Sequence, residues 1–104
     1  MSNHASHVLE VRFSGAVFSL FVTVEGQEID LRFDGDSTWQ RTITGFVVTG
    51  PLDVACLAKG LSQTECVLQI TLDGTVAGEF KGTISAKGIW QIVRSIPVPG
   101  AERA

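Results

Sequence analysis

The chain carries few charged residues and no run of like charge. Charged residues make up 18% of its 104 positions, against roughly 25% in an average globular protein. The net charge is −3, and the eight lysines and arginines are scattered, so the basic surface typical of nucleic-acid binding is absent. We therefore expect no nucleic-acid partner. A chain so poor in charge can fill a core and still leave apolar side chains on its surface.

Long hydrophobic segments are also missing. No apolar stretch approaches the roughly 18 residues that span a bilayer, and the first residues lack the basic start and apolar segment of a signal peptide. We therefore expect a protein without a membrane span, cytoplasmic by default. A secreted form whose leader has been removed would carry the same sequence.

Histidine is scarce, which argues against an enzyme. The two histidines, His4 and His7, both lie near the N-terminus, whereas a Ser–His or Cys–His nucleophile needs its base held rigidly. The carboxylates are spread over the chain without a shared apolar pocket. No segment shows the helical periodicity that a phosphate-binding Gly-rich turn would require. We predict a non-enzymatic protein that uses no cofactor.

Two short segments carry candidate metal ligands, each with a simpler explanation. With the initiator methionine removed, residues 2–4 would offer a square-planar set for Cu(II) or Ni(II), but an ordinary polar terminus explains them. Asp30, Asp34 and Asp36 could offer oxygens to calcium. Their spacing lacks the ligand pattern of known calcium loops, and a solvated turn explains it. We predict no metal site.

The sequence is rich in apolar residues that alternate with a period of two, which indicates β-strands. Turn residues separate strands expected at 7–13, 16–24, 28–33, 38–48, 52–56, 66–72, 75–84 and 89–96. We predict an all-β fold, an antiparallel two-sheet immunoglobulin-like sandwich of about seven to eight strands, with a small barrel as the alternative. Residues 7–96 would form a single domain, residues 1–6 a disordered N-terminal tail and residues 97–104 a C-terminal tail.

Residues 50–74 are expected to organise this fold. Closing a hairpin near Leu61 would pair Cys56 with Cys66 and place apolar side chains opposite each other. The two cysteines could then form a cross-strand disulfide or stay reduced in the core, which we favour. Asp73-Gly74 offers the positive-φ pair of a tight turn into the next strand.

Finer features are predicted from parity, meaning which alternate residues face inward. In strand 38–48 the parity changes near Gly45, which indicates a β-bulge. Gly78 and Gly82 share an inward face and leave room for Trp39 or Trp90 from the opposing sheet. Two further strands are predicted to direct these side chains inward: Phe18, Leu20, Val22 and Val24 in the one, and Ile29, Leu31 and Phe33 in the other.

Apolar side chains remain on the outward faces of two strands. They are Val17 and Phe21 in strand 16–24, and Ile89 and Val93 in strand 89–96. If the two strands are neighbours, these four form a contiguous patch, and such patches mark interfaces. The alternative is that loops or the tail at 97–99 cover them.

The outward side chains suggest what the protein does. We expect an interaction module that self-associates or docks on a protein partner through Val17, Phe21, Ile89 and Val93. The alternative is a domain that binds a glycan or a lipid through Trp39 or Trp90, although a small sandwich usually needs a tryptophan in its core.

Residues 38–78 resemble the small β-sandwich domain of the mycobacterial membrane protein small (MmpS) family and similar bacterial domains. The shared pattern is a tryptophan before a strand, an alternating strand, then a Thr-x-Cys strand closed by Asp-Gly. Here these elements are Trp39, Leu52-Val54-Cys56, Thr64-Glu65-Cys66 and Asp73-Gly74. The resemblance implies a sandwich that binds or braces. That family has an N-terminal membrane anchor and commonly a second cysteine in the last strand, both absent here, so its role beside lipid exporters is not carried over.

Overall fold

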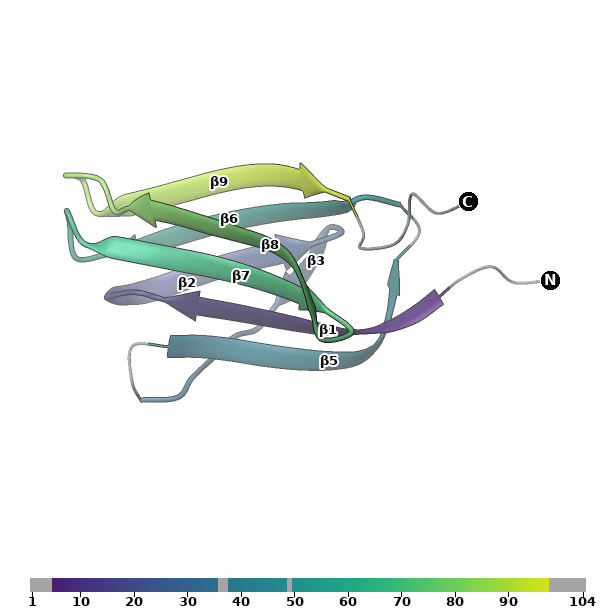
Figure 1. Cartoon of the computed structure of the whole chain (residues 1–104). Helices are drawn as coiled ribbons and strands as arrows, with labels where there is room; N and C mark the ends of the chain where they lie inside the picture. The colour runs from purple at the N-terminus through teal and green to yellow at the C-terminus, as the bar shows by residue number, and fades with distance from the viewer. Residues whose placement is uncertain (1–4, 36–37, 49, 98–104) are drawn as a thin grey trace.

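The computed structural model describes residues 5–35, 38–48 and 50–97, with only the backbone of Ala5. This part of the chain contains strands and no helix (Figure 1). The strands are β1 (Ala5–Ser14), β2 (Val17–Val24), β3 (Gln27–Ile29), β4 (Arg32–Phe33), β5 (Thr38–Val48), β6 (Leu52–Gly60), β7 (Glu65–Leu72), β8 (Thr75–Thr83) and β9 (Ile89–Ile96). β1 begins two residues before the expected start at residue 7. The tails were predicted at 1–6 and 97–104. Residues 5 and 6 belong to β1 instead, and residues 1–4 and 98–104 lie outside the described residues.

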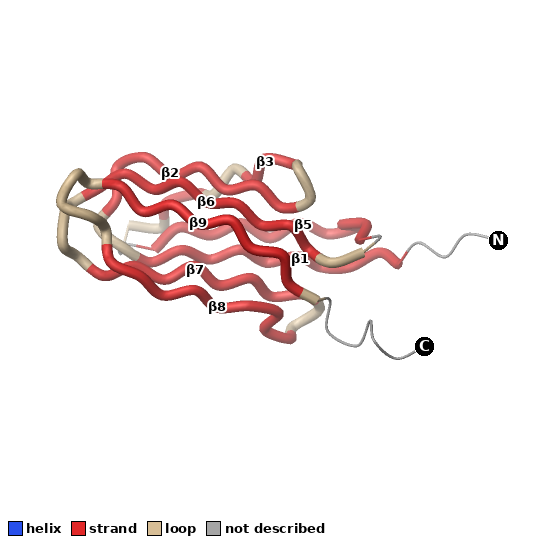
Figure 2. The backbone as a smooth tube through the Cα atoms, turned by 90° about the horizontal axis from the view of Figure 1, so that it is seen from above, coloured by secondary structure: helices blue, strands red, loops and turns tan. Residues whose placement is uncertain are grey.

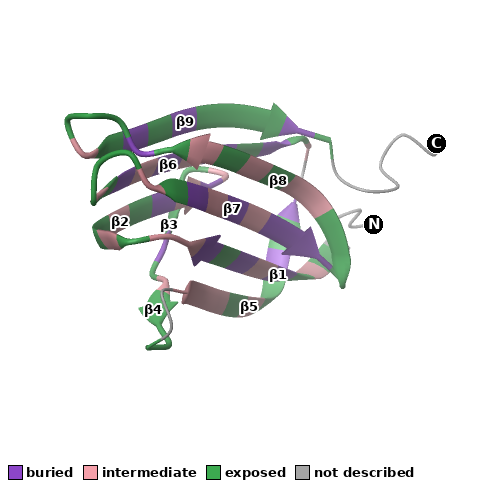
Figure 3. Cartoon of the chain, turned by 60° about the vertical axis from the view of Figure 1, so that its left-hand side comes forward, coloured by how far each residue is buried: buried purple, intermediate pink, exposed green. Residues whose placement is uncertain are grey.

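The strands form two antiparallel sheets packed as a sandwich, which confirms the predicted all-β class. One sheet has the order β4-β5-β1-β7-β8 and the other β3-β2-β6-β9. The view along the layers in Figure 2 shows the two sheets facing each other. Because each strand buries alternate side chains, the core fills the space between the sheets, and buried and exposed bands alternate along the ribbons in Figure 3.

The predicted hairpin between residues 52–56 and 66–72 is wrong. β6 pairs with β2 and β9, whereas β7 pairs with β1 and β8. The segment between β6 and β7 therefore carries the chain from one sheet to the other. It is held there because the Leu61 N–H donates to the Ala16 carbonyl (2.9 Å) and the Gln63 N–H to the Ile84 carbonyl (2.7 Å). Inward apolar residues in both segments fit two arrangements equally well: strands paired in one sheet, and strands of two sheets that face each other across the core.

The predicted third strand is in fact two strands. Residues 27–29 pair with β2 in the four-stranded sheet, and residues 32–33 pair with β5 in the five-stranded sheet. The chain crosses between the sheets at Asp30 and Leu31, which raises the strand number above the expected seven to eight. Phe33, predicted to face inward, is 53% exposed. Its ring lies against that of Trp39, with centroids 4.9 Å apart.

A bulge in β2 overturns two further side-chain predictions. Val17 is opposite Gly60 and Ser19 is opposite Lys59, so β2 holds one extra residue at Phe18. Phe18, predicted inward, is 77% exposed. Val17, predicted outward, packs against the core instead. Beyond the bulge the predicted parity holds, and Val22 and Val24 are fully buried.

Two local predictions are confirmed. Asp73 and Gly74 have φ angles of 53° and 82° and close the tight turn between β7 and β8. Between the pairs His7–Phe46 and Leu9–Ile43, β1 advances by two residues and β5 by three. The extra residue of β5 forms the bulge at Gly45. Gly45 has a φ of 72°, a conformation that favours glycine.

Of the two glycines of β8, Gly82 provides the predicted room for a tryptophan, whereas Gly78 faces Phe80 and Ile96. A Cβ on Gly82 would lie 2.1 Å from Nε1 of Trp90, so the indole of β9 rests directly on the backbone of β8. The Trp90 ring also contacts Phe13 of β1, with ring centroids 6.0 Å apart. This contact joins the edge strand β9 to the five-stranded sheet across the core.

Candidate interaction surface

The outer side of the four-stranded sheet carries a group of apolar side chains, here called the apolar face. Its members come from three adjacent strands: Phe21 of β2, Ala55 and Leu57 of β6, and Ile89 and Val93 of β9. The exposed fractions of Phe21, Ile89 and Val93 are 45%, 39% and 68%. Ala55 and Leu57 are half-buried between them. Strand register aligns Phe21 with Leu57, and Ala55 with Val93, so the group is continuous across the sheet.

The strands expected to form this patch are not direct neighbours. β6 lies between β2 and β9, and its Leu57 fills the gap that the sequence prediction left open. The signal for Leu57 was present, because it follows the inward-facing Cys56 and must therefore point outward. Val17 does not belong to the apolar face, since the bulge at Phe18 turns it toward the core.

The described loops do not cover the apolar face, as the exposed fractions show. The alternative that the tail at 97–99 covers it falls, for residues 98 and 99, outside the described residues. Pro97 itself is exposed. The face is therefore open over the part of the chain that the structure describes.

Charges of opposite sign frame the apolar face along β6. Asp53 and Lys59 are both exposed and point outward at the two ends of the strand. A second carboxylate lies beside Asp53, because the Asp53 N–H donates to Oε2 of Glu25 (2.9 Å) and the Glu25 N–H to the Asp53 carbonyl (2.8 Å). One end of the face is therefore acidic and the other is basic.

The outer side of the five-stranded sheet has a polar row across its middle, and this sheet also carries exposed valines at Val8, Val47 and Val76. One aligned row crosses all its strands and consists of Arg32, Gln40, Arg12, Gln69 and Glu79. Its members pair with each other, since Arg12 donates to Gln40 (3.1 Å) and Gln69 to Glu79 (3.3 Å). An open depression of about 240 Å³ is lined by Arg12, Gln69 and Glu79 of this row together with Ser14 and Val67, and one of about 250 Å³ adjoins it at Val67.

The two tryptophans do not both reach the surface. Trp90 is 8% exposed and belongs to the core, so it cannot stack on a ligand in the folded protein. Trp39 is half-buried against the core with its ring facing Phe33. Its Nε1 is buried and has no hydrogen-bond partner among the described residues. Only Trp39 remains as a candidate for the alternative ligand site.

The cysteines are free thiols in the core, each on a different sheet. Burial, together with the neighbouring Cys66, raises the pKa of Cys56 to about 12, and burial also raises the pKa of Cys66. Both groups therefore stay protonated near neutral pH, the form in which a thiol is a poor nucleophile.

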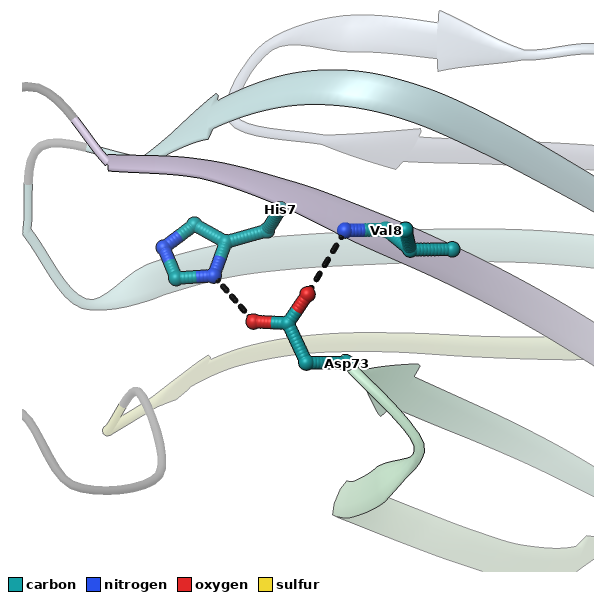
Figure 4. A network of polar contacts seen from close by, with 3 residues as sticks. All are labelled: His7, Val8 and Asp73. Carbon is teal, nitrogen blue, oxygen red and sulfur yellow. Dashed lines mark hydrogen bonds and ion pairs between the residues drawn. The ribbon is translucent and has the colours of Figure 1, made fainter.

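A polar cluster ties β1 to the turn between β7 and β8 (Figure 4). Nδ1 of His7 lies 2.5 Å from Oδ2 of Asp73, and the Val8 N–H donates to Oδ1 of Asp73 (2.8 Å). The Asp73 N–H donates in return to the Val8 carbonyl (2.8 Å). The hydrogen bonds from His7 and then Val8 lower the pKa of Asp73. This geometry explains how the strand end is held in place.

Among residues 5–35, 38–48 and 50–97 there is no group of three or more histidine, cysteine, aspartate or glutamate side chains placed to hold a metal ion. The candidate ligands at residues 2–4 and Asp36 lie outside the described residues. No helix in this part of the chain is long and apolar enough to cross a membrane.

No protein-family profile, curated protein or solved structure matches this chain. The fold and the surface together define a small β-sandwich with a continuous apolar group on the outer side of its four-stranded sheet.

Proposed function

We propose that the protein is a non-enzymatic interaction module that docks on a protein, either a second copy or another chain, through its apolar face. One observation carries the proposal: Phe21, Ile89 and Val93 stand exposed on one sheet, and strand register joins them through the half-buried Ala55 and Leu57 into one continuous group. Contiguous apolar groups of this kind are typical of interaction sites, and an aromatic anchor such as Phe21 is typical of their energetic centre.

The charges around the apolar face favour a protein over a nucleic acid. Lys59 is the cation on this face of β6, and Glu25 and Asp53 lie at the opposite end. Phosphate groups would meet at least as much negative as positive charge there, which opposes nucleic-acid binding.

Substitution of the exposed side chains by aspartate tests the proposal. We expect the wild-type protein to form dimers or larger species as its concentration rises, and Phe21→Asp or Val93→Asp to shift it to monomer, because a buried carboxylate without a partner opposes association. Light scattering after size-exclusion chromatography measures the mass.

Val76→Asp is the matched control for this test. Val76 is 52% exposed on β8 of the other sheet, so its replacement should leave the mass unchanged. Thermal unfolding of each variant verifies that it is folded. A wild-type protein that stays monomeric at every concentration, and is indifferent to Phe21→Asp, would count against the proposal.

The alternative function, binding of a glycan or a lipid, now depends on Trp39 and the exposed ring of Phe33 beside it. Titration with glycans and lipids should shift the tryptophan fluorescence if this function holds. The immunoglobulin-like relation stays a proposal too, supported by the two antiparallel sheets packed face to face. The resemblance to the MmpS domains adds the suggestion that such sandwiches bind or brace.

A further inference from the structure

We propose that the partner of the apolar face is a second copy of this chain, packed face to face about a two-fold axis at the level of Cys56. The axis lies in the plane of the interface and runs perpendicular to the strands. As a result, β6 of one copy lies over β6 of the other and runs antiparallel to it. This inference rests on the proposed function and adds to it the identity of the partner and the register of the contact.

The outward residues of β6 carry the argument for the register. They are Asp53, Ala55, Leu57 and Lys59, spaced evenly on either side of Cys56. A two-fold axis at that level places each Asp53 opposite Lys59 of the second copy, twice in the dimer. It also places each Leu57 opposite Ala55, a large side chain over a small one. Isologous interfaces require such self-complementary patterns, and opposite charges fix their register.

The neighbouring strands follow the same rule. Val22 of β2 and Ile92 of β9 lie at the level of Cys56. The axis therefore sets Phe21 opposite Thr23 and Val93 opposite Gln91 in the second copy. Phe21 again meets a smaller side chain, and Val93 meets the flexible side chain of Gln91, which can turn aside as the two faces approach.

Other symmetric arrangements are less favourable. An axis parallel to the strands would set Asp53 against Asp53 and Lys59 against Lys59, and like charges that face each other repel. Pairing between two β9 edges meets a different obstacle. The Gly60 N–H donates to the Gly88 carbonyl (2.9 Å), so these two residues form a hydrogen-bonded pair between β6 and β9. Hydrogen-bonded and non-hydrogen-bonded pairs alternate along antiparallel strands. Val93 and Ala55 therefore form a non-hydrogen-bonded pair, and the main-chain groups of Val93 point toward the free edge of β9.

Arg94 covers that free edge. Its Nη1 donates to the Val93 carbonyl (3.0 Å), although its position in the strand has inward parity. A charged side chain folded onto the edge of a sheet hinders strand addition. The β9 edge is therefore unsuited to pairing with a second copy.

The size of the face sets the expected strength. The three long strands β2, β6 and β9, about 4.8 Å apart and about eight residues long, project roughly 400 Å², which is small beside the roughly 800 Å² per partner of a standard interface. Packed sheets cross at about 30°, so the match is best near the axis. We expect a dissociation constant between roughly 10 µM and 1 mM.

Charge reversal on β6 tests the register. Asp53→Lys alone and Lys59→Asp alone each replace two attractive pairs by two repulsive ones, and we expect each to raise the dissociation constant about tenfold or more. The double variant restores opposite charges with the signs exchanged and should return to within about threefold of the wild type. Sedimentation equilibrium over a concentration series measures the constants, and added salt should weaken the wild-type dimer.

The matched controls are Glu79→Lys and Lys81→Asp, which reverse exposed charges on β8 of the other sheet and should leave the dissociation constant unchanged.

The outcomes separate the two proposals. If Phe21→Asp breaks the dimer but the double variant does not recover it, the register is overturned and the proposed function stands. If the wild type stays monomeric to about 1 mM, the second copy is overturned as partner. If a dimer forms and ignores Phe21→Asp, both proposals fall.

Discussion

A single absent methyl group determines how closely the two sheets approach at Gly82. A Cβ there would lie 2.1 Å from Nε1 and 2.8 Å from Cε2 of Trp90, both far inside contact distance. We expect Gly82→Ala to lower the free energy of unfolding by about 1–3 kcal/mol, because the indole must move out of its packed position. Urea denaturation measures the loss.

Gly50→Ala is the control for this substitution. A Cβ on Gly50 would have nothing within 4 Å, so the change should have little effect or stabilise slightly through the unfolded chain. Equal effects of the two substitutions would show that the close approach at Gly82 does not limit stability.

At the same scale, Asp73 makes stability depend on pH. Its hydrogen bonds with His7 and Val8 hold the pKa below the ordinary value. The stabilisation is therefore complete above the unfolded-state pKa, near 3.9, and is lost as pH falls through the lower native pKa. We expect Asp73→Asn, which keeps the positive-φ preference of the turn, to reduce stability at neutral pH, and the gap to close in acid.

Urea midpoints of wild type and variant from about pH 7 to about pH 2.5 test this expectation. His7→Ala should reproduce part of the loss, because the hydrogen bond from His7 is the largest cause of the lowered pKa. A gap that stays constant over the whole pH range would mean that the carboxylate is not responsible.

At the scale of the element, the sequence predicted irregularities with a local cause. The bulge at Gly45 was predictable because apolar residues change parity there. The bulge at Phe18 was hidden, since Val17, Phe18, Leu20 and Phe21 are apolar and either parity can be satisfied. The same ambiguity explains the wrong hairpin, because inward residues at 52–56 and 66–72 suit strands that face each other across the core. Alternation tells which side chains are buried and not which strands are paired.

The Gly45 bulge gives a test at this scale. Its φ of 72° is unfavourable for a residue with a Cβ, although space exists, since the nearest atom to a built Cβ is Oγ of Ser6 at 3.8 Å. We expect Gly45→Ala to cost about 1–2 kcal/mol of unfolding free energy from the backbone alone. Gly45→Asn should cost less, because asparagine tolerates this conformation better. Chemical denaturation of the three proteins gives the order, and an asparagine variant weaker than the alanine variant would contradict this explanation.

At the scale of the whole molecule, the apolar face could be predicted only in part. Alternation predicts that Phe21, Ile89 and Val93 point away from the core, and the structure places them so. It does not tell that β6 separates β2 from β9, because the order of strands is set by contacts between distant segments. The role of Leu57 in joining the patch therefore emerged only from the fold. In a face-to-face dimer, four sheets would stack in one direction about 10 Å apart.

The seat of Trp90 on the backbone of Gly82 has one more consequence. The indole is packed against the main chain of the facing sheet and shielded from solvent. It is therefore an intrinsic fluorescence probe of whether the two sheets are in contact. In a Trp39→Phe background, the emission of Trp90 would report when the two sheets separate at this point during unfolding. It would show, without an attached dye, whether this separation comes before or after the strands lose their secondary structure.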